Sequence, residues 1–188
     1  MLLHKRTLIF LIFFIIGNQN FIAQTMMDIF VTEIIDLNSV EDKEFFLCNI
    51  NDLDQKVRHE LRDCETLKFG SLECAEYKLN ENKTDLENLT KITAYLRLYG
   101  YPSKKDFSEK ASNTPWLVLH HNVGTATNID KEFAPLLVEA YRKNDITLVN
   151  LHWYLKRYFY SYMGRPYERT TQTSETEDIE FLIRELKL

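Results

Sequence analysis

The sequence predicts an all-α protein, with a single compact domain of several helices after an N-terminal signal peptide. Three observations lead to this prediction. Glycine and proline, which β-sandwiches and barrels need for their many turns, number only 5 and 4 among 188 residues. Apolar residues recur at spacings of three and four along most of the chain, as on one face of a helix. Capping boxes mark two expected helix starts, at Thr84 and Ser174.

The N-terminal segment has the layout of a signal peptide. Lys5 and Arg6 supply its positive end, and an unbroken apolar run follows at residues 8–16. This run is too short to span a bilayer, which takes about 20 residues, so it predicts a cleaved leader and not a membrane anchor. Cleavage after Ala23 would leave residues 24–188 as a mature helical domain that is periplasmic or secreted.

Two short helices are expected at the beginning of the domain. The segment 28–37 predicts the first, because its apolar side chains recur at helical spacing: Ile29, Phe30, Ile34 and Leu37. Asn51 is expected to cap the second. The apolar stripe of this second helix has a spacing of four and lies opposite a charged face: Leu53, Val57 and Leu61.

Two further helices are expected in the middle of the chain, separated by a polar stretch at residues 80–83. The first covers residues 70–82 and carries apolar residues on one side: Leu72, Ala75 and Leu79. The second begins at Thr84, which forms a capping box with Glu87, and it ends at Gly100. Its apolar stripe is the clearest in the chain: Leu86, Leu89, Ile92, Leu96 and Tyr99.

Thr114 and Pro115 are expected to start the next helix, as its cap and its first residue. This helix leads into the apolar run at residues 116–119, which has no polar face and is therefore predicted to be buried. A helix over residues 130–143 follows, and Asn144 is expected to terminate it.

The last two helices have clear boundaries in the sequence. The first, residues 147–163, ends before Gly164 and has one apolar stripe: Leu148, Leu151, Leu155, Phe159 and Tyr162. It is rich in aromatic residues, which we expect mainly in the core, although a tyrosine stripe can also line a pocket or a protein-binding face. Ser174 and Glu177 form a capping box for the final helix, whose apolar residues are Ile179, Leu182, Ile183 and Leu186.

The charge pattern argues against nucleic acid as a partner. The formal net charge is −5, and it becomes more negative once Lys5 and Arg6 leave with the signal peptide. A protein that binds nucleic acid needs a basic surface for the phosphates. The remaining basic residues are interspersed with acids, as on a solvated helix surface. We therefore expect another protein as the partner, and no stable membrane anchor in the mature form.

Cys48, Cys64 and Cys74 are odd in number, so they cannot all be paired. One bridge could form in an oxidising compartment, and Cys64 with Cys74 is the best candidate because a turn at Gly70 separates them. The alternative is that all three are small buried apolar residues, as free cysteines commonly are.

No metal and no cofactor is predicted. His120 and His121 are adjacent, so on a helix they point about 100° apart and cannot face one metal ion together as an i, i+4 pair can. We expect one of them to be hydrogen-bonded in the interior and the other to lie at the surface. Glycine-rich phosphate or dinucleotide loops and the G-x-S-x-G nucleophile motif do not occur. Catalytic groups can still converge from distant segments.

Four fragments with polar or aromatic residues follow one another between residues 50 and 168: Asp54-Gln55-Lys56-Val57-Arg58, Gly100-Tyr101-Pro102, Trp116 with His121, and Arg157 followed by Gly164. Together they resemble an uncharacterised bacterial family of unknown function, whose members carry D-Q-x-x-R, G-W-P, W-x-x-x-x-H and D-R motifs in this order. Tyr101 stands where the family has Trp, and Lys156 where it has Asp. The family's Q-x-Y-G-T-Q ending is missing.

The resemblance implies that polar side chains from separate helices gather in one place: Asp54, Gln55, Arg58, His121 and Arg157. One interpretation is a hydrogen-bonded network that fixes the packing of the helices. The other is a binding site.

Two classes of function fit these features. The first is an exported, non-enzymatic binding or interaction protein, because the domain is small, acidic, helical and poor in catalytic motifs. The alternative is an enzyme or small-ligand-binding protein with a site around His121, Asp54 and Arg58. A site of the second kind requires side chains that converge on a solvent-reachable pocket, whereas an interaction protein requires an exposed apolar patch rimmed by charge.

Overall fold

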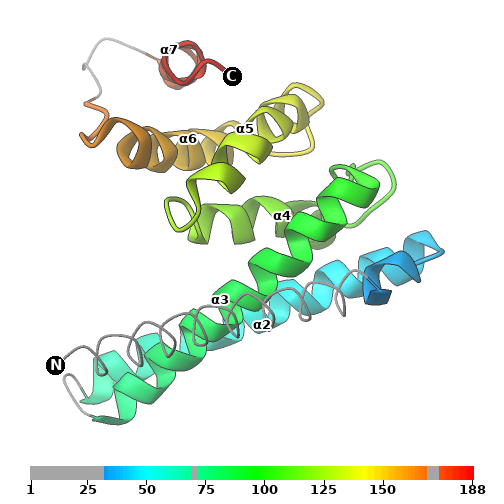
Figure 1. Ribbon diagram of the computed structural model, residues 1–188, viewed down its shortest axis with the longest axis vertical. Helices are drawn as coiled ribbons and strands as arrows, with labels where there is room; N and C mark the ends of the chain where they lie inside the picture. The colour runs from blue at the N-terminus through cyan, green and yellow to red at the C-terminus, as the bar shows by residue number, and fades with distance from the viewer. Residues whose placement is uncertain (1–31, 69–71, 169–173) are drawn as a thin grey trace, which may run out of the picture.

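The computed structural model describes residues 32–68, 72–168 and 174–188, and its regular elements there are all helices (Figure 1). They are α2 (Val40–Lys68), α3 (Leu72–Tyr99), α4 (Glu109–His121), α5 (Thr127–Arg142), α6 (Leu148–Met163) and α7 (Glu175–Leu186). One helical turn at residues 32–35 precedes α2. The all-α prediction is confirmed. The expected signal peptide, its cleavage after Ala23 and most of the helix expected at residues 28–37 lie outside the described residues.

The two longest helices, α2 and α3, form an antiparallel hairpin, which is the long lower layer in Figure 1. Helix α4 packs on both α2 and α3, and it also contacts α6. Helix α6 in turn packs against α5 and α7. The order of contacts therefore runs from the hairpin through α4 to the C-terminal helices, and α4 joins the two halves of the core. No helix in the described part of the chain is long and apolar enough to cross a membrane.

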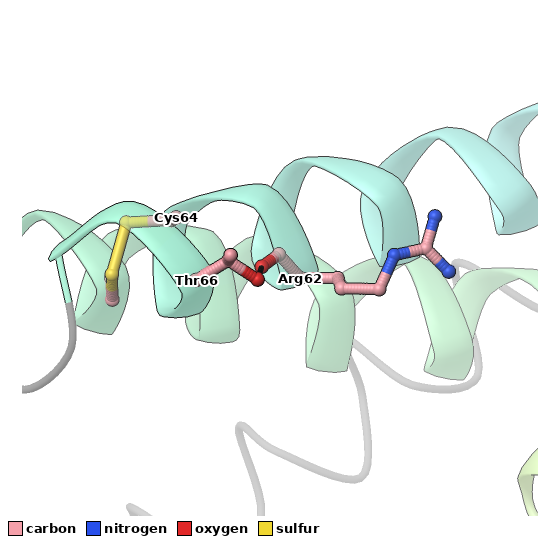
Figure 2. Close-up of a disulfide and its surroundings, with 4 residues drawn as sticks. Arg62, Cys64 and Thr66 are labelled. Atoms are coloured by element: carbon pink, nitrogen blue, oxygen red, sulfur yellow. Dashed lines mark hydrogen bonds between the residues drawn. A yellow bond between two sulfur atoms is a disulfide. The ribbon is translucent and has the colours of Figure 1, made fainter.

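A disulfide closes the hairpin near its tip. Cys64 of α2 and Cys74 of α3 are bonded, with their Cα atoms 5.6 Å apart, whereas Cys48 is a free thiol (Figure 2). Of the two alternatives for the cysteines, the bridge is therefore the one found. Next to it, the Thr66 hydroxyl donates to the carbonyl oxygen of Arg62 at 2.8 Å, one turn earlier on the same helix.

Helix α2 begins about three turns before the predicted start at Asn51. Ser39 caps it: its hydroxyl accepts from the backbone N–H of Asp42 at 3.0 Å, and the Asp42 carboxylate accepts from the backbone N–H of Ser39 at 3.2 Å. Asn51 lies inside the helix and donates to the Thr114 hydroxyl of α4 at 3.3 Å. The prediction of Asn51 as a cap was wrong because this asparagine serves a contact between helices.

Helix α3 is one continuous helix where two were predicted. The polar stretch at residues 80–83 and the expected cap at Thr84 lie in its middle. The apolar side predicted for the first of the two helices was also wrong, since Leu72 and Leu79 are 92% and 69% exposed while Glu81 is buried. Packing against α2 decides which face turns inward, and that face carries charged groups.

Helix α4 starts at Ser108, whose side chain accepts from the backbone N–H of Ala111, and not at Thr114. Pro115 therefore lies within the helix. The run that follows is buried as predicted, with only Leu117 partly exposed. Gly100, at a φ of 73°, ends α3 in the left-handed conformation that glycine adopts at low cost.

The C-terminal helices agree closely with the sequence patterns. Helix α6 has the bounds predicted for it to within one residue: Thr147 is its N-cap, and Gly164, at a φ of 67°, ends it as predicted. The capping box of Ser174 and Glu177 is present at the start of α7. All four apolar residues expected on the inner face of α7 are buried: Ile179, Leu182, Ile183 and Leu186. On α6, Tyr162 was placed in the apolar stripe but is 62% exposed, because the helix turns this last position away from the core.

Candidate ligand-binding site

Asp54 is the centre of a polar network between α2, α3 and α4. Its spacing of four from Arg58 puts both side chains on one face of α2. The Asp54 side chain is completely buried, and it accepts hydrogen bonds from Gln55 Nε2 at 2.9 Å and from Arg58 Nε and Nη2 at 3.2 Å each. Each oxygen of this buried carboxylate thus has a donor, as a buried charge requires.

His121, at the end of α4, completes the contacts of Asp54. Its Nδ1 lies 3.1 Å from Asp54 Oδ1. Burial alone would raise the pKa of Asp54, but hydrogen bonds and charge interactions with His121 and Arg58 outweigh this effect, so its pKa is lowered. An ionised Asp54 accepts a hydrogen from Nδ1, and in a neutral imidazole this leaves Nε2 as the acceptor.

Arg58 also reaches across the hairpin to two carboxylates of α3. Its Nη1 donates to Glu81 Oε1 at 2.8 Å, and its Nη2 donates to Asp85 Oδ1. The second oxygen of Glu81 pairs with Lys78. Burial, and repulsion by Asp54 and Glu81, raise the pKa of Asp85 despite the opposing charge of Arg58. This part of the network was missed in the sequence, although Lys78, Glu81 and Asp85 have the spacing of one helix face.

Arg157 comes from α6 and lies at the same site without a partner. Among the described residues it forms no hydrogen bond and no ion pair. Burial lowers its pKa, and the nearby charge of Arg58 lowers it further, while Asp130 acts in the opposite direction. Two guanidinium groups therefore lie close enough to repel each other, and of the two only Arg58 is neutralised by direct contacts with residues that the structure describes.

A cavity of about 690 Å³ brings these groups together. Its walls include Arg58, Asp85, His121 and Arg157, and it is open to solvent. Asp54 and Gln55 do not line it, so they lie behind the cavity and hold Arg58 and His121 in place. This volume is within the range of about 300 to 1,000 Å³ that is usual for small-molecule sites.

The lining of the cavity also includes apolar residues and an arginine held in an ion pair. The apolar lining residues include Leu86 and Leu89 of α3 with Ala126 and Ile129 near the start of α5. At the cavity, Arg97 of α3 donates from Nε and Nη2 to the two carboxylate oxygens of Glu132 of α5, both at 2.7 Å. The hydrogen bond between them raises the pKa of Arg97 and lowers that of Glu132.

A second buried carboxylate, Asp130 of α5, interacts electrostatically with Arg157. It accepts from the backbone N–H of Gly124 at 2.9 Å and from the Tyr154 hydroxyl at 3.5 Å. Burial raises its pKa, and the hydrogen bond from Gly124 offsets part of this increase. No sequence pattern indicates a role for Asp130, because its partners are a loop amide and the hydroxyl of a distant helix.

The two adjacent histidines, of which one was expected in the interior and the other at the surface, are both half-buried but have different environments. His121 is the hydrogen-bonded one, with its side chain 18% exposed. His120 stacks on Trp116, with ring centroids 5.1 Å apart, and also contacts Trp153. Burial, together with the positive charges of Arg157, His121 and Arg58, lowers the pKa of His120 to about 4. His120 is therefore neutral at physiological pH.

The five residues that the resemblance singled out thus fall into two groups in space. Asp54, Gln55, Arg58 and His121 are joined by direct contacts, and Arg157 faces them across the cavity. Within the described ranges, no group of three or more His, Cys, Asp and Glu residues has the arrangement of a metal site.

No protein-family model matches the sequence, and no match to it was found among curated proteins or solved structures. The resemblance to the uncharacterised bacterial family therefore stays a prediction, and the site is interpreted from its own residues.

Proposed function

We propose that this chain is an exported binding protein whose cavity between α2, α3, α4 and α6 holds a small anionic ligand. The observation that carries the proposal is Arg157. Arg157 is exposed to solvent at the cavity, lies near the positive charge of Arg58, and among the described residues has no counter-charge in direct contact. Its donors are therefore available to a ligand that brings a negative charge.

A carboxylate or phosphate group of a ligand would supply that partner. The planar fork of an arginine matches two oxygens of such a group, and this geometry makes charge-assisted pairs stronger than neutral hydrogen bonds. Arg58 is less suited to this role, because Asp54, Glu81 and Asp85 accept hydrogen bonds from four of its five N–H donors and neutralise its charge. Arg157 is therefore the residue on which we place the anionic group.

Export is supported by two further features. The three-zone layout of residues 1–23 is that of a cleaved leader. The bond between Cys64 and Cys74 is of the kind that persists in oxidising compartments such as the periplasm. A ligand of this protein would accordingly be a molecule found outside the cytoplasm.

The experiment that tests the proposal compares two neighbouring cations of α6. Isothermal titration calorimetry with acetate, inorganic phosphate and small organic acids is carried out on the exported protein and on Arg157→Gln and Lys156→Gln. We expect binding of at least one anion, weakened about tenfold or more by Arg157→Gln and unchanged by Lys156→Gln, whose side chain does not line this cavity. Equal affinities in all three proteins would contradict the proposal.

A second candidate function, catalysis, is favoured by the geometry of His121. Asp54 holds its Nδ1, while Nε2 has no partner among the described residues and the ring lines the cavity. A carboxylate that orients an imidazole in this way is the usual support of a general base. The discriminating measurement is turnover: if His121→Asn leaves ligand affinity intact while a chemical conversion of the bound ligand stops, the protein is an enzyme.

A further inference from the structure

We infer that the ligand is a zwitterion of the amino-acid or short-peptide kind, with its carboxylate on Arg157 and its ammonium group on Asp85. This inference rests on the proposed function and names the ligand class. The two residues belong to different layers: Asp85 is on α3 in the hairpin, and Arg157 is on α6 above α4. Both line the same cavity.

Among the carboxylates of the network, Asp85 has an oxygen that can accept a hydrogen bond from a ligand. Asp54 is fully buried behind the cavity, and both oxygens of Glu81 are used by Arg58 and Lys78. Asp85 uses only Oδ1, for Arg58, and within the described residues Oδ2 has no partner. Its side chain is 18% exposed, and it lines the cavity.

The Arg157 guanidinium and the Asp85 carboxylate have opposite charges, so a simple anion is not the best ligand for this cavity. A phosphate or an acetate bound at Arg157 would leave Asp85 without a donor and would add negative charge to the cavity. An ammonium group beside Asp85 removes both problems, because it donates hydrogen bonds and carries the opposite charge. It would also offset the burial and the repulsion from Asp54 and Glu81 that raise the pKa of this carboxyl.

The apolar residues that line the cavity indicate the nature of the ligand between its carboxylate and its ammonium group. Leu86, Leu89 and Ile129 line it beside the charged groups, so a ligand that fills the cavity presents aliphatic as well as charged surface. An aliphatic amino acid or a peptide of such residues has all three features. The volume of about 690 Å³ corresponds to on the order of twenty water molecules, which leaves room for a ligand larger than a single amino acid.

The test uses ligands from which one charge at a time is removed. Leucine and leucyl-leucine carry both groups, 4-methylpentanoate lacks the amine of leucine, and 3-methylbutylamine lacks its carboxylate. Calorimetric titration of the exported protein, after bound material has been removed by dialysis, should show that leucine or leucyl-leucine binds about tenfold or more tightly than either truncated compound. Preference for leucyl-leucine would identify the short-peptide form, and preference for leucine the amino-acid form.

Two variants then assign each charge to its residue. Asp85→Asn keeps an oxygen for Arg58 but removes the negative charge, so it should lower the affinity for leucine or the dipeptide to about that for 4-methylpentanoate. It should not weaken the binding of 4-methylpentanoate, which has no ammonium group. Arg157→Gln should in the same way lower the affinity for leucine or leucyl-leucine to about that for 3-methylbutylamine. Glu87→Gln is the matched control on α3, because Glu87 forms an ion pair with Lys83 and is not among the residues that line the cavity. Circular dichroism verifies that each variant is folded.

The outcomes separate this inference from the proposed function. If 4-methylpentanoate or phosphate binds as tightly as the zwitterions and Arg157→Gln abolishes that binding, the zwitterion is wrong and the anion site stands. If Arg157→Gln changes no affinity, or if none of the compounds binds, both proposals are overturned.

Discussion

His121 Nδ1 and Arg58 Nη2 contact the same oxygen, Oδ1 of Asp54, at 3.1 and 3.2 Å. This single buried atom joins the end of α4 to the hairpin. Removing it in Asp54→Ala leaves the histidine and part of the arginine without their acceptor, so we expect a loss of about 1 to 3 kcal/mol in the free energy of unfolding. Urea denaturation measures it. The control, Asp52→Ala, breaks an exposed pair with Lys110 and should cost less than about 1 kcal/mol.

His121 and Arg157 should behave differently when each is replaced by alanine. His121→Ala removes a hydrogen bond to a fully buried carboxylate and should destabilise the domain by about 1 to 3 kcal/mol. Arg157→Ala removes a charge that has no hydrogen bond or ion pair among the described residues, so the melting temperature should stay the same or rise while ligand binding is lost. Differential scanning calorimetry gives both values. A large fall in the melting temperature of Arg157→Ala would mean that this residue is structural.

The stacked imidazole of His120 should make stability depend on pH. Its pKa is about 4 in the folded protein and about 6.5 in an unfolded chain, so the unfolded state takes up the proton first as the pH falls. The contribution of His120 is therefore fully present above about pH 6.5 and is lost as the pH falls towards 4. His120→Phe keeps a ring between the tryptophans and cannot be protonated. Urea denaturation between pH 7 and 4 should show a flatter profile for this variant than for the unaltered protein.

Loss of the disulfide should destabilise the hairpin. The bond between Cys64 and Cys74 spans a sequence separation of 10 residues, and for a loop of this size its removal should cost about 3 kcal/mol. The double replacement Cys64→Ser with Cys74→Ser should therefore unfold at lower urea concentration and become insensitive to reducing agent. Cys48→Ser is the control and should keep its response to the reducing agent, since Cys48 is free.

Intact-mass analysis tests the export proposal. The protein purified from its native compartment should lack residues 1 to 23 and should carry one disulfide and one free thiol. A chain that retains Met1 and is extracted only with detergent would contradict a cleaved leader.

Local signals in the sequence were enough to predict the ends of α6 and α7. Thr147, Gly164 and the box of Ser174 with Glu177 satisfy backbone groups within one turn, so their effect does not depend on the rest of the fold. The same kind of signal failed at Thr84. There the helix continues because α2 packs alongside it, and neither helix shows this in its own sequence.

The candidate site was predictable only in part for the same reason. The motif order singled out Asp54, Arg58 and His121, which contact one another in the structure. Glu81 and Asp85 were missed because the polar stretch around them was taken for a boundary between helices. Their role depends on the alignment of two antiparallel helices, which is set by contacts far apart in the sequence.

The disulfide at the hairpin tip has a consequence for this alignment. Cys64 lies six residues after Arg58, and Cys74 lies seven residues before Glu81, so the bond is about 10 Å along the helix axes from the ion pair. A slip of the hairpin by one turn, about 5.4 Å, would carry Glu81 and Asp85 past Arg58. The disulfide holds the two helices in one alignment and so prevents this slip. Reduction of the bond between Cys64 and Cys74 would remove this covalent constraint on the register of the charges at the cavity.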